Sequence, residues 1–140
     1  MKYLKKFNES LNESLKDIDS ICKEYGIDNY TINNDGSIDV DGNVDLVGRR
    51  LSKLPLKFGS VSGYFNCQNN QLTSLEGAPR SVGRDFYCHD NQLTSLRGAP
   101  ESVGVNFYCH NNQLTSLKGA PKSVGGDFYC RNNQLTSLRG

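Results

Sequence analysis

The sequence predicts an α/β solenoid: a coil with a short-stranded parallel sheet, preceded by an N-terminal helix and a β-hairpin cap. Two observations predict it. A phrase such as "DFYCHDNQLTSL" recurs every 21 residues, and the first 42 residues carry a different pattern with helical spacing. A strict period of this length is typical of proteins whose units stack on one another. We therefore divide the chain into a cap, residues 1–42, and a solenoid, residues 43–140.

The N-terminal segment begins with an amphipathic pattern. Apolar side chains recur at spacings of three and four on a background rich in Lys, Glu, Asn and Asp, which places them along one stripe of a helix. Gly26 is a natural end for this helix. The stripe consists of Leu4, Phe7, Leu11, Leu15, Ile18, Ile21, Cys22 and Tyr25.

A hairpin is expected after the helix. The stretch "NYTINNDGSIDVDG" contains two alternating segments around Asn34, Asp35 and Gly36, a strong hairpin signal. A solenoid must cover its first open coil, so we interpret the helix and hairpin as a cap. The alternative is that the helix is a docking or sorting element.

The solenoid follows its period without a single insertion. Stepping one period upstream from Phe65 and Cys67 reaches Val44 and Leu46, so a fifth, degenerate unit begins near residue 43. The repeated apolar positions, each 21 residues apart, are Phe65, Phe86, Phe107 and Phe128; Cys67, Cys88, Cys109 and Cys130; and Leu72, Leu93, Leu114 and Leu135.

Each unit begins with a short alternating segment. Phe86 and Cys88 alternate with Tyr87 and His89, which is the spacing of a strand with one buried face. "DNQL" then turns the chain, and the Gly and Pro of "GAPRSVG" exclude a long helix from the return path. One such coil cannot bury its apolar side chains alone, so we expect stability to come from stacking in a parallel sheet.

The last unit is incomplete, because it has no "GAPxSVG" segment after its turn. We expect its apolar side chains to face water on one side unless further repeats, a second copy of the chain or another protein covers them. End-to-end self-association is therefore one expectation. The side chains concerned are Phe128, Cys130, Leu135 and Leu138.

The phrases "CQNNQLTSL", "CHDNQLTSL", "CHNNQLTSL" and "CRNNQLTSL" resemble leucine-rich repeats, particularly the short bacterial kind that contains "NQLTSLP". The resemblance covers residues 43–140 and departs from the family pattern in placing Phe and Cys at two strand leucines, and a Val-Gly pair, as in Val82 and Gly83, at another. It implies a curved solenoid with its parallel sheet on the concave side, and a function in protein recognition. It also implies a structural asparagine ladder at the turns, formed by Asn70, Asn91, Asn112 and Asn133.

The opening "MKYLKKFNESLNESL" is similar to short N-termini on proteins of large tailed bacteriophages, where such helices can target proteins into the prohead. "LNE", from Leu11 to Glu13, also resembles the short sites cut by phage prohead proteases. These resemblances imply a phage origin and cleavage after Glu13.

The cysteine ladder is expected to be structural. In-register strands spread four thiols over about 14 Å, whereas a tetrahedral zinc site needs ligands that converge on one point. Side chains of neighbouring parallel rungs point the same way, which disfavours the dihedral angle of a disulfide. We interpret Cys67, Cys88, Cys109 and Cys130 as free, buried apolar residues beside phenylalanine.

The outward side chains of the sheet form the candidate binding face. Tyrosine provides a large contact area at low entropy cost and is enriched at binding surfaces, although stacked tyrosines can also simply stabilise neighbouring strands. Two histidines without a third ligand of clear geometry do not predict a metal site. The face comprises Tyr64, Asn66, Asp85, Tyr87, His89, Asn106, Tyr108, His110, Asp127, Tyr129 and Arg131, with Gln68 beside the histidines.

Composition argues against several classes of function. Sixteen Lys and Arg against fifteen Asp and Glu give a formal net charge of +1, which does not favour nucleic acid or an anionic membrane as a partner. No apolar run approaches the ~20 residues of a membrane span, and the N-terminus lacks the apolar region of a signal peptide. Five cysteines, an odd number with four at a fixed interval, favour a reducing compartment. We expect a cytoplasmic protein of a bacterial host cell, or a virion-associated one if the phage resemblance holds.

No catalytic motif is present. The chain lacks a nucleophile signature, a phosphate-binding glycine loop and an HExxH sequence, and its polar side chains are copied from unit to unit. An active site instead needs unlike groups that converge. We therefore expect no catalytic residues and no cofactor. The leading prediction is a non-catalytic protein-interaction module with an unknown protein partner. The alternative is a structural or assembly protein, such as a virion or prohead component, that stacks through its C-terminal end or docks by its helix.

Overall fold

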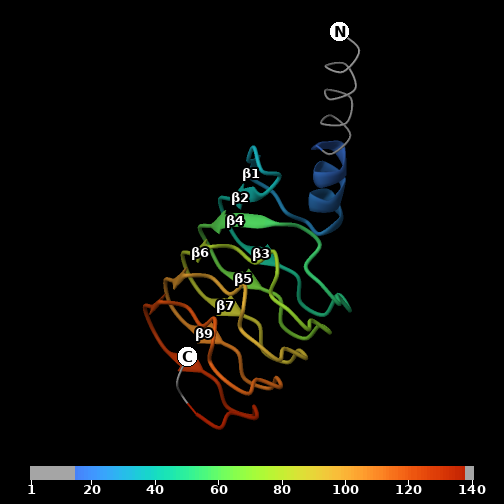
Figure 1. Cartoon of the computed structure of the whole chain (residues 1–140). Helices are drawn as coiled ribbons and strands as arrows, with labels where there is room; N and C mark the ends of the chain where they lie inside the picture. The colour runs from blue at the N-terminus through green and yellow to red at the C-terminus, as the bar shows by residue number, and fades with distance from the viewer. Residues whose placement is uncertain (1–14, 138–140) are drawn as a thin grey trace.

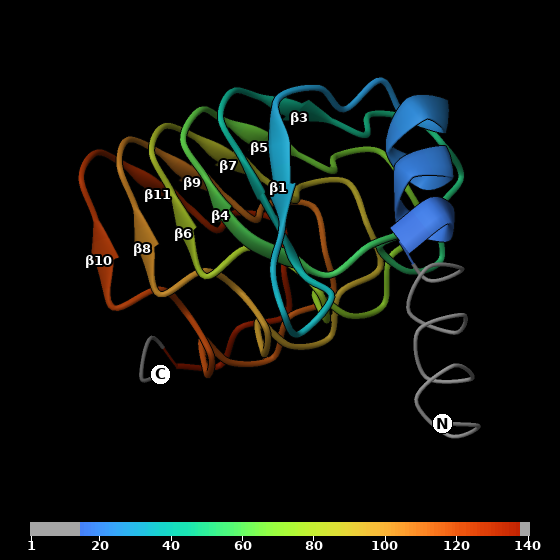
Figure 2. The same cartoon turned by 90° about the horizontal axis from the view of Figure 1, so that it is seen from above.

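The computed structural model describes residues 15–137 and shows a β-solenoid in which parallel strands of successive units stack into two sheets (Figures 1 and 2). The coils advance from the helix at one end to β10 and β11 at the other (Figure 2). Leu4, Phe7, Leu11, the proposed cleavage position at Glu13 and Leu138 lie outside the described residues.

The N-terminal segment forms the predicted helix and hairpin. Residues 15–24 are helical, and after them Gly26 takes a left-handed backbone conformation with φ of 67°. Strands β1 (Tyr30–Ile32) and β2 (Ile38–Val40) pair antiparallel around the turn that contains Gly36. Because β2 also pairs in parallel with β4, the hairpin continues one sheet of the solenoid. Cys22, Ile27, Ile38 and Val40 belong to the same buried cluster as the coils, as a cap requires.

The repeat units pair in register in both sheets. In the second sheet, Val44 faces Phe65, Phe65 faces Phe86, Phe86 faces Phe107, and Phe107 faces Phe128. Val44 therefore occupies the predicted place in the degenerate first unit. The second sheet, in order, is β11 (Phe128–Tyr129), β9 (Phe107–Tyr108), β7 (Phe86–Tyr87), β5 (Phe65–Asn66) and β3 (Val44–Asp45).

The first sheet runs through the "GAPxSVG" segments, where the sequence excluded a long helix but did not predict a strand. Its Ser-Val pairs are strands, with the valines of β6 and β8 buried and their serines turned outward. The glycine after each pair is required by close packing, since a Cβ at Gly104 would lie 2.0 Å from the carbonyl oxygen of Gly83. After β1 and β2, this sheet continues with β4 (Phe58–Val61), β6 (Ser81–Val82), β8 (Ser102–Val103) and β10 (Ser123–Val124).

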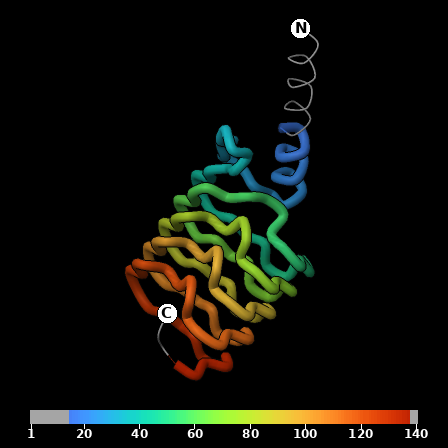
Figure 3. Tube along the Cα trace, in the orientation of Figure 1, coloured from blue at the N-terminus to red at the C-terminus, as the bar shows by residue number. Residues whose placement is uncertain are grey.

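The core lies inside the coils and consists of columns of identical side chains. Phe65, Phe86 and Phe107 are fully buried, and their rings stack with centroids 5.4 Å apart. Cysteine and leucine columns lie within the same cluster. In the last described coil, Phe128 and its neighbours are only partly buried, as the sequence predicts. Figure 3 traces this coil, in red, at the end of the stack that lies opposite the helix. No helix within residues 15–137 has the length and apolar character needed to cross a bilayer.

The asparagines at the turns form a ladder of buried hydrogen bonds. The side-chain amide of Asn112 donates to the carbonyl oxygens of Cys88 and Cys109, both at 3.1 Å, and its Oδ1 accepts the backbone N–H of Leu93 at 3.0 Å. Asn91 makes the same contacts one coil earlier. Each asparagine thus joins two coils by satisfying backbone groups that water does not reach.

Replacing Asn112 with alanine should lower the free energy of unfolding by about 2–4 kcal/mol, because it leaves the buried N–H of Leu93 without its partner and removes one of the two asparagine donors to the carbonyl oxygens of Cys88 and Cys109. Chemical denaturation monitored by circular dichroism would measure the change. The adjacent, exposed Gln113→Ala substitution is the control and should change stability by less than about 0.5 kcal/mol. Equal stability of the two variants would show that the ladder does not hold the coils together.

Candidate functional site

The outward face of the second sheet carries a column of stacked tyrosines. Phe and Cys of each unit point into the core, so the residues between them point out. The rings of Tyr87 and Tyr108 lie 4.8 Å apart with planes 7° from parallel, and those of Tyr108 and Tyr129 also lie 4.8 Å apart, at 3°. Tyr129 is 38% exposed, while the other two are half-buried. The column is therefore an ordered aromatic surface that solvent reaches.

A column of histidines runs beside the tyrosines. The rings of His89 and His110 stack with centroids 4.3 Å apart. Each histidine also meets the tyrosine of its own coil edge-on, at 6.0 Å from Tyr87 and 6.1 Å from Tyr108. Burial lowers the pKa of both histidines, and the neighbouring His110 lowers that of His89 further. The structure thus brings the predicted tyrosines and histidines together on one face.

A third column of predicted face residues, formed by Tyr64, Asp85, Asn106 and Asp127, precedes the tyrosines and also links neighbouring coils. The carboxylate of Asp85 accepts the backbone N–H of Asn106 at 3.0 Å, and Oδ1 of Asn106 accepts the N–H of Asp127 at 2.7 Å. Nδ2 of Asn106 donates to the Tyr108 hydroxyl at 3.0 Å, and the Tyr129 hydroxyl donates to Asp127 at 3.2 Å. The hydrogen bond to Asp127 raises the pKa of Tyr129. These polar side chains therefore tie coils together and orient the tyrosine hydroxyls.

The remaining predicted face residues lie at the ends of these columns. Tyr64 meets Tyr87 edge-on at 6.2 Å. Asn66 is paired with Tyr87 across β5 and β7, which makes it the first member of the tyrosine column. Gln68 and Arg131 occupy the positions before and after the two histidines in the repeat. The structure thus places all the predicted face residues along a single sheet.

The cysteines are free, and four of the five are buried. Burial raises the pKa of Cys67 and Cys109 to about 12 and that of Cys88 well above its usual value. Cys130, in the last described coil, is partly exposed. Because the thiolate is the reactive and metal-binding form, the buried ladder is chemically inert, as a packing role requires.

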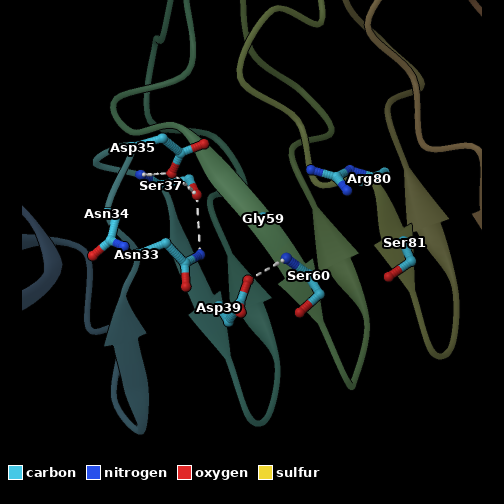
Figure 4. Close-up of a pocket in the computed structure, with 9 residues that line it drawn as sticks. All are labelled: Asn33, Asn34, Asp35, Ser37, Asp39, Gly59, Ser60, Arg80 and Ser81. Atoms are coloured by element: carbon cyan, nitrogen blue, oxygen red, sulfur yellow. Dashed lines mark hydrogen bonds between the residues drawn. The ribbon is translucent and has the colours of Figure 1, made fainter.

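A polar hollow of about 450 Å³ lies between the hairpin turn and strands β4 and β6 (Figure 4). Its two carboxylates are already engaged. Asp35 accepts hydrogen bonds from the Ser37 hydroxyl and backbone and from Lys57, which hold its pKa below the usual range. Asp39 accepts the backbone N–H of Ser60 at 2.9 Å. These acidic groups stabilise the turn and the first coils, and sequence reasoning did not single them out.

Sequence reasoning also missed a third polar group beside the histidines. The potential ligand atoms of His89, Asp90 and His110 all lie within 4.8 Å of one another, and Nε2 of His89 lies 4.0 Å from Oδ2 of Asp90. Comparing the units would have found it, because the residues at the same position are Asn69, Asn111 and Asn132 in the other three strong units and Gly48 in the degenerate first unit. Asp90 is the only acidic residue among them.

Comparisons with known proteins give no relative: no family model matches the chain, and neither a curated protein nor a solved structure shows significant similarity. The resemblances to leucine-rich repeats and to phage proteins therefore rest on the quoted phrases alone.

Proposed function

We propose that the protein is a non-catalytic interaction module that binds a protein partner through the tyrosine and histidine columns of its second sheet. The supporting observation is that the fold does not need aromatic residues there. In β5 the tyrosine position is occupied by Asn66, and in β3 by Asp45, yet both strands pair in register with their neighbours. Aromatic side chains that the sheet can do without are available for binding.

The chemistry of the face fits a protein surface. Stacked tyrosines offer a rigid apolar area, while their hydroxyls and the nearby imidazoles offer hydrogen bonds, and interfaces are enriched in this combination. The stacking is already present in the free molecule, so little side-chain entropy is lost on binding. The resemblance to leucine-rich repeats, which use the corresponding sheet face, supports the same assignment by analogy.

Replacing Tyr87, Tyr108 and Tyr129 together with asparagine, the residue that Asn66 provides in the same column, should abolish partner binding while preserving the coil. Affinity capture from a lysate of the source cells, followed by quantitative mass spectrometry, would measure the loss. Three truncated aromatic anchors should reduce capture of a specific partner by about tenfold or more. Circular dichroism checks that the variant is folded.

The matched control changes the other sheet of the same coils, with Ser81, Ser102 and Ser123 replaced by alanine. This variant should capture the partner as the original chain does. A partner that the tyrosine variant retains and the serine variant loses would contradict the assignment and place binding on the opposite sheet.

The second candidate function is a structural or assembly role through the C-terminal end. Phe128, Cys130 and Leu135 are partly buried, whereas Phe107, Cys109 and Leu114 are fully buried one coil earlier. The last described coil therefore presents apolar side chains next to the unpaired edges of β10 and β11. A matching end of a second copy would cover both.

Under this second candidate, the 140-residue chain should form dimers or larger species as its concentration rises, because association buries the partly exposed apolar residues. Static light scattering over a concentration series would measure the mass. Leu135→Glu should shift the chain toward monomer. A monomer at every concentration, with no binding of a dye for exposed apolar surface, would rule out end-to-end assembly.

A further inference from the structure

The structure brings two imidazoles and one carboxylate together just after the inner strands β7 and β9 of the second sheet. We propose that His89, His110 and Asp90 bind a divalent transition-metal cation of the Zn²⁺ type. Their potential ligand atoms lie within 4.8 Å of one another. Imidazole nitrogen and carboxylate oxygen are ligands that Zn²⁺ takes readily. The site does not depend on the proposed protein partner.

The stack brings the three side chains close together before any cation binds. The two rings stack at 4.3 Å because their strands are in register. Asp90 sits in the turn with φ of 55°, and its Oδ1 accepts a hydrogen bond from Nδ2 of Asn111 at 2.8 Å. That bond orients the carboxylate and leaves Oδ2 on the side of His89, 4.0 Å from Nε2. A hydrogen bond of this kind to a metal-binding carboxylate is a common supporting contact.

The carboxylate is a departure from the repeat that the fold does not require. Asn132 donates to Oδ1 of Asn111 at 2.7 Å, as Asn111 does to Asp90, so an amide at position 90 would continue the same ladder. Asparagine occupies this position in the other three strong units, and Gly48 occupies it in the degenerate first unit. The single acidic residue of this column is thus placed next to both histidines of the chain. The histidines and Asp90 all differ from the residues that other units carry at these positions, and this coincidence in sequence is independent of the distances between them.

The electrostatics suit a cation. The Asp90 carboxylate places a negative charge beside the two rings, and a neutral imidazole offers a nitrogen lone pair to a cation. Nδ1 of each ring is buried and has no hydrogen-bond partner among the described residues, and Nε2 of His89 is the nitrogen that lies 4.0 Å from Oδ2 of Asp90. Arg131, one coil beyond His110, carries an opposing charge, but its side chain is exposed and can turn into water.

Binding of a cation requires the three donor atoms to move closer together. Tetrahedral zinc with bonds of about 2.0–2.1 Å sets neighbouring donor atoms roughly 3.3 Å apart. In the bound state that we propose, the two half-buried imidazoles rotate about their side-chain bonds to bring the donor atoms closer together. Three protein ligands leave one position open to water, which is the pattern of an accessible site rather than a closed structural one.

The test titrates the folded chain with Zn²⁺ by isothermal calorimetry and with Co²⁺ by absorption spectroscopy. The variants use residues that other coils already carry: Asp90→Asn follows Asn111, His89→Gln follows Gln68, and His110→Arg follows Arg131. We expect one cation per chain, affinity reduced about tenfold or more by Asp90→Asn, and binding lost in either histidine variant. Glu101→Gln, an exposed acidic position next to β8, is the control and should bind as the original chain does.

Two results would overturn the proposal. One is the absence of binding to the original chain at millimolar Zn²⁺. The other is binding that Asp90→Asn and His89→Gln leave unchanged, which would assign the cation to other groups, such as the partly exposed Cys130. Thiolate charge-transfer bands in the Co²⁺ spectrum would identify that second case, whereas nitrogen and oxygen ligands give only weak visible bands. Circular dichroism of each variant separates loss of the site from loss of the fold.

Discussion

The fold depends on backbone hydrogen bonds that join each coil to the same position of the next. The N–H groups of Phe65, Phe86 and Phe107 donate to the carbonyl oxygens of Asp85, Asn106 and Asp127, at 2.9–3.0 Å. Because these partners recur with the 21-residue period, an insertion in one coil would break the register of both sheets. The asparagine ladder repeats the same constraint at the turns. This explains why the units are so uniform in length.

Because the coils are uniform, positions at which the residue differs between units show which side chains the fold does not require. The inward positions are all required for packing, and the Asp85, Asn106 and Asp127 column is partly required, since two of its members accept backbone N–H groups of the next coil. The tyrosine and histidine positions are different, because Asn66 and Gln68 fill them in an earlier coil. The side chains that stacking does not require, Asp90 among them, are therefore the candidates for a role in binding.

Much of the architecture could be predicted because a strict period and the alternation of Phe and Cys leave little freedom in how coils stack. The hairpin was equally clear from Asn34, Asp35 and Gly36. The Ser-Val strands of the first sheet could not be predicted, since a two-residue strand shows no alternation and lies between Pro and Gly. The face could be located from the alternation of the sequence. The hydrogen bonds of Asp85 and Asn106 could not be predicted, because a polar residue next to a strand gives the same sequence pattern whether or not its side chain is hydrogen-bonded.

Hydrogen–deuterium exchange, resolved to single amides by NMR, tests the central claim that every coil is held by in-register bonds to the next. The account predicts protection that recurs with the 21-residue period, at the amides of Phe65, Phe86 and Phe107 and of Cys67, Cys88 and Cys109. Slow exchange restricted to the N-terminal cap and first coil, with fast exchange of the amides of β7 and β9, would contradict it.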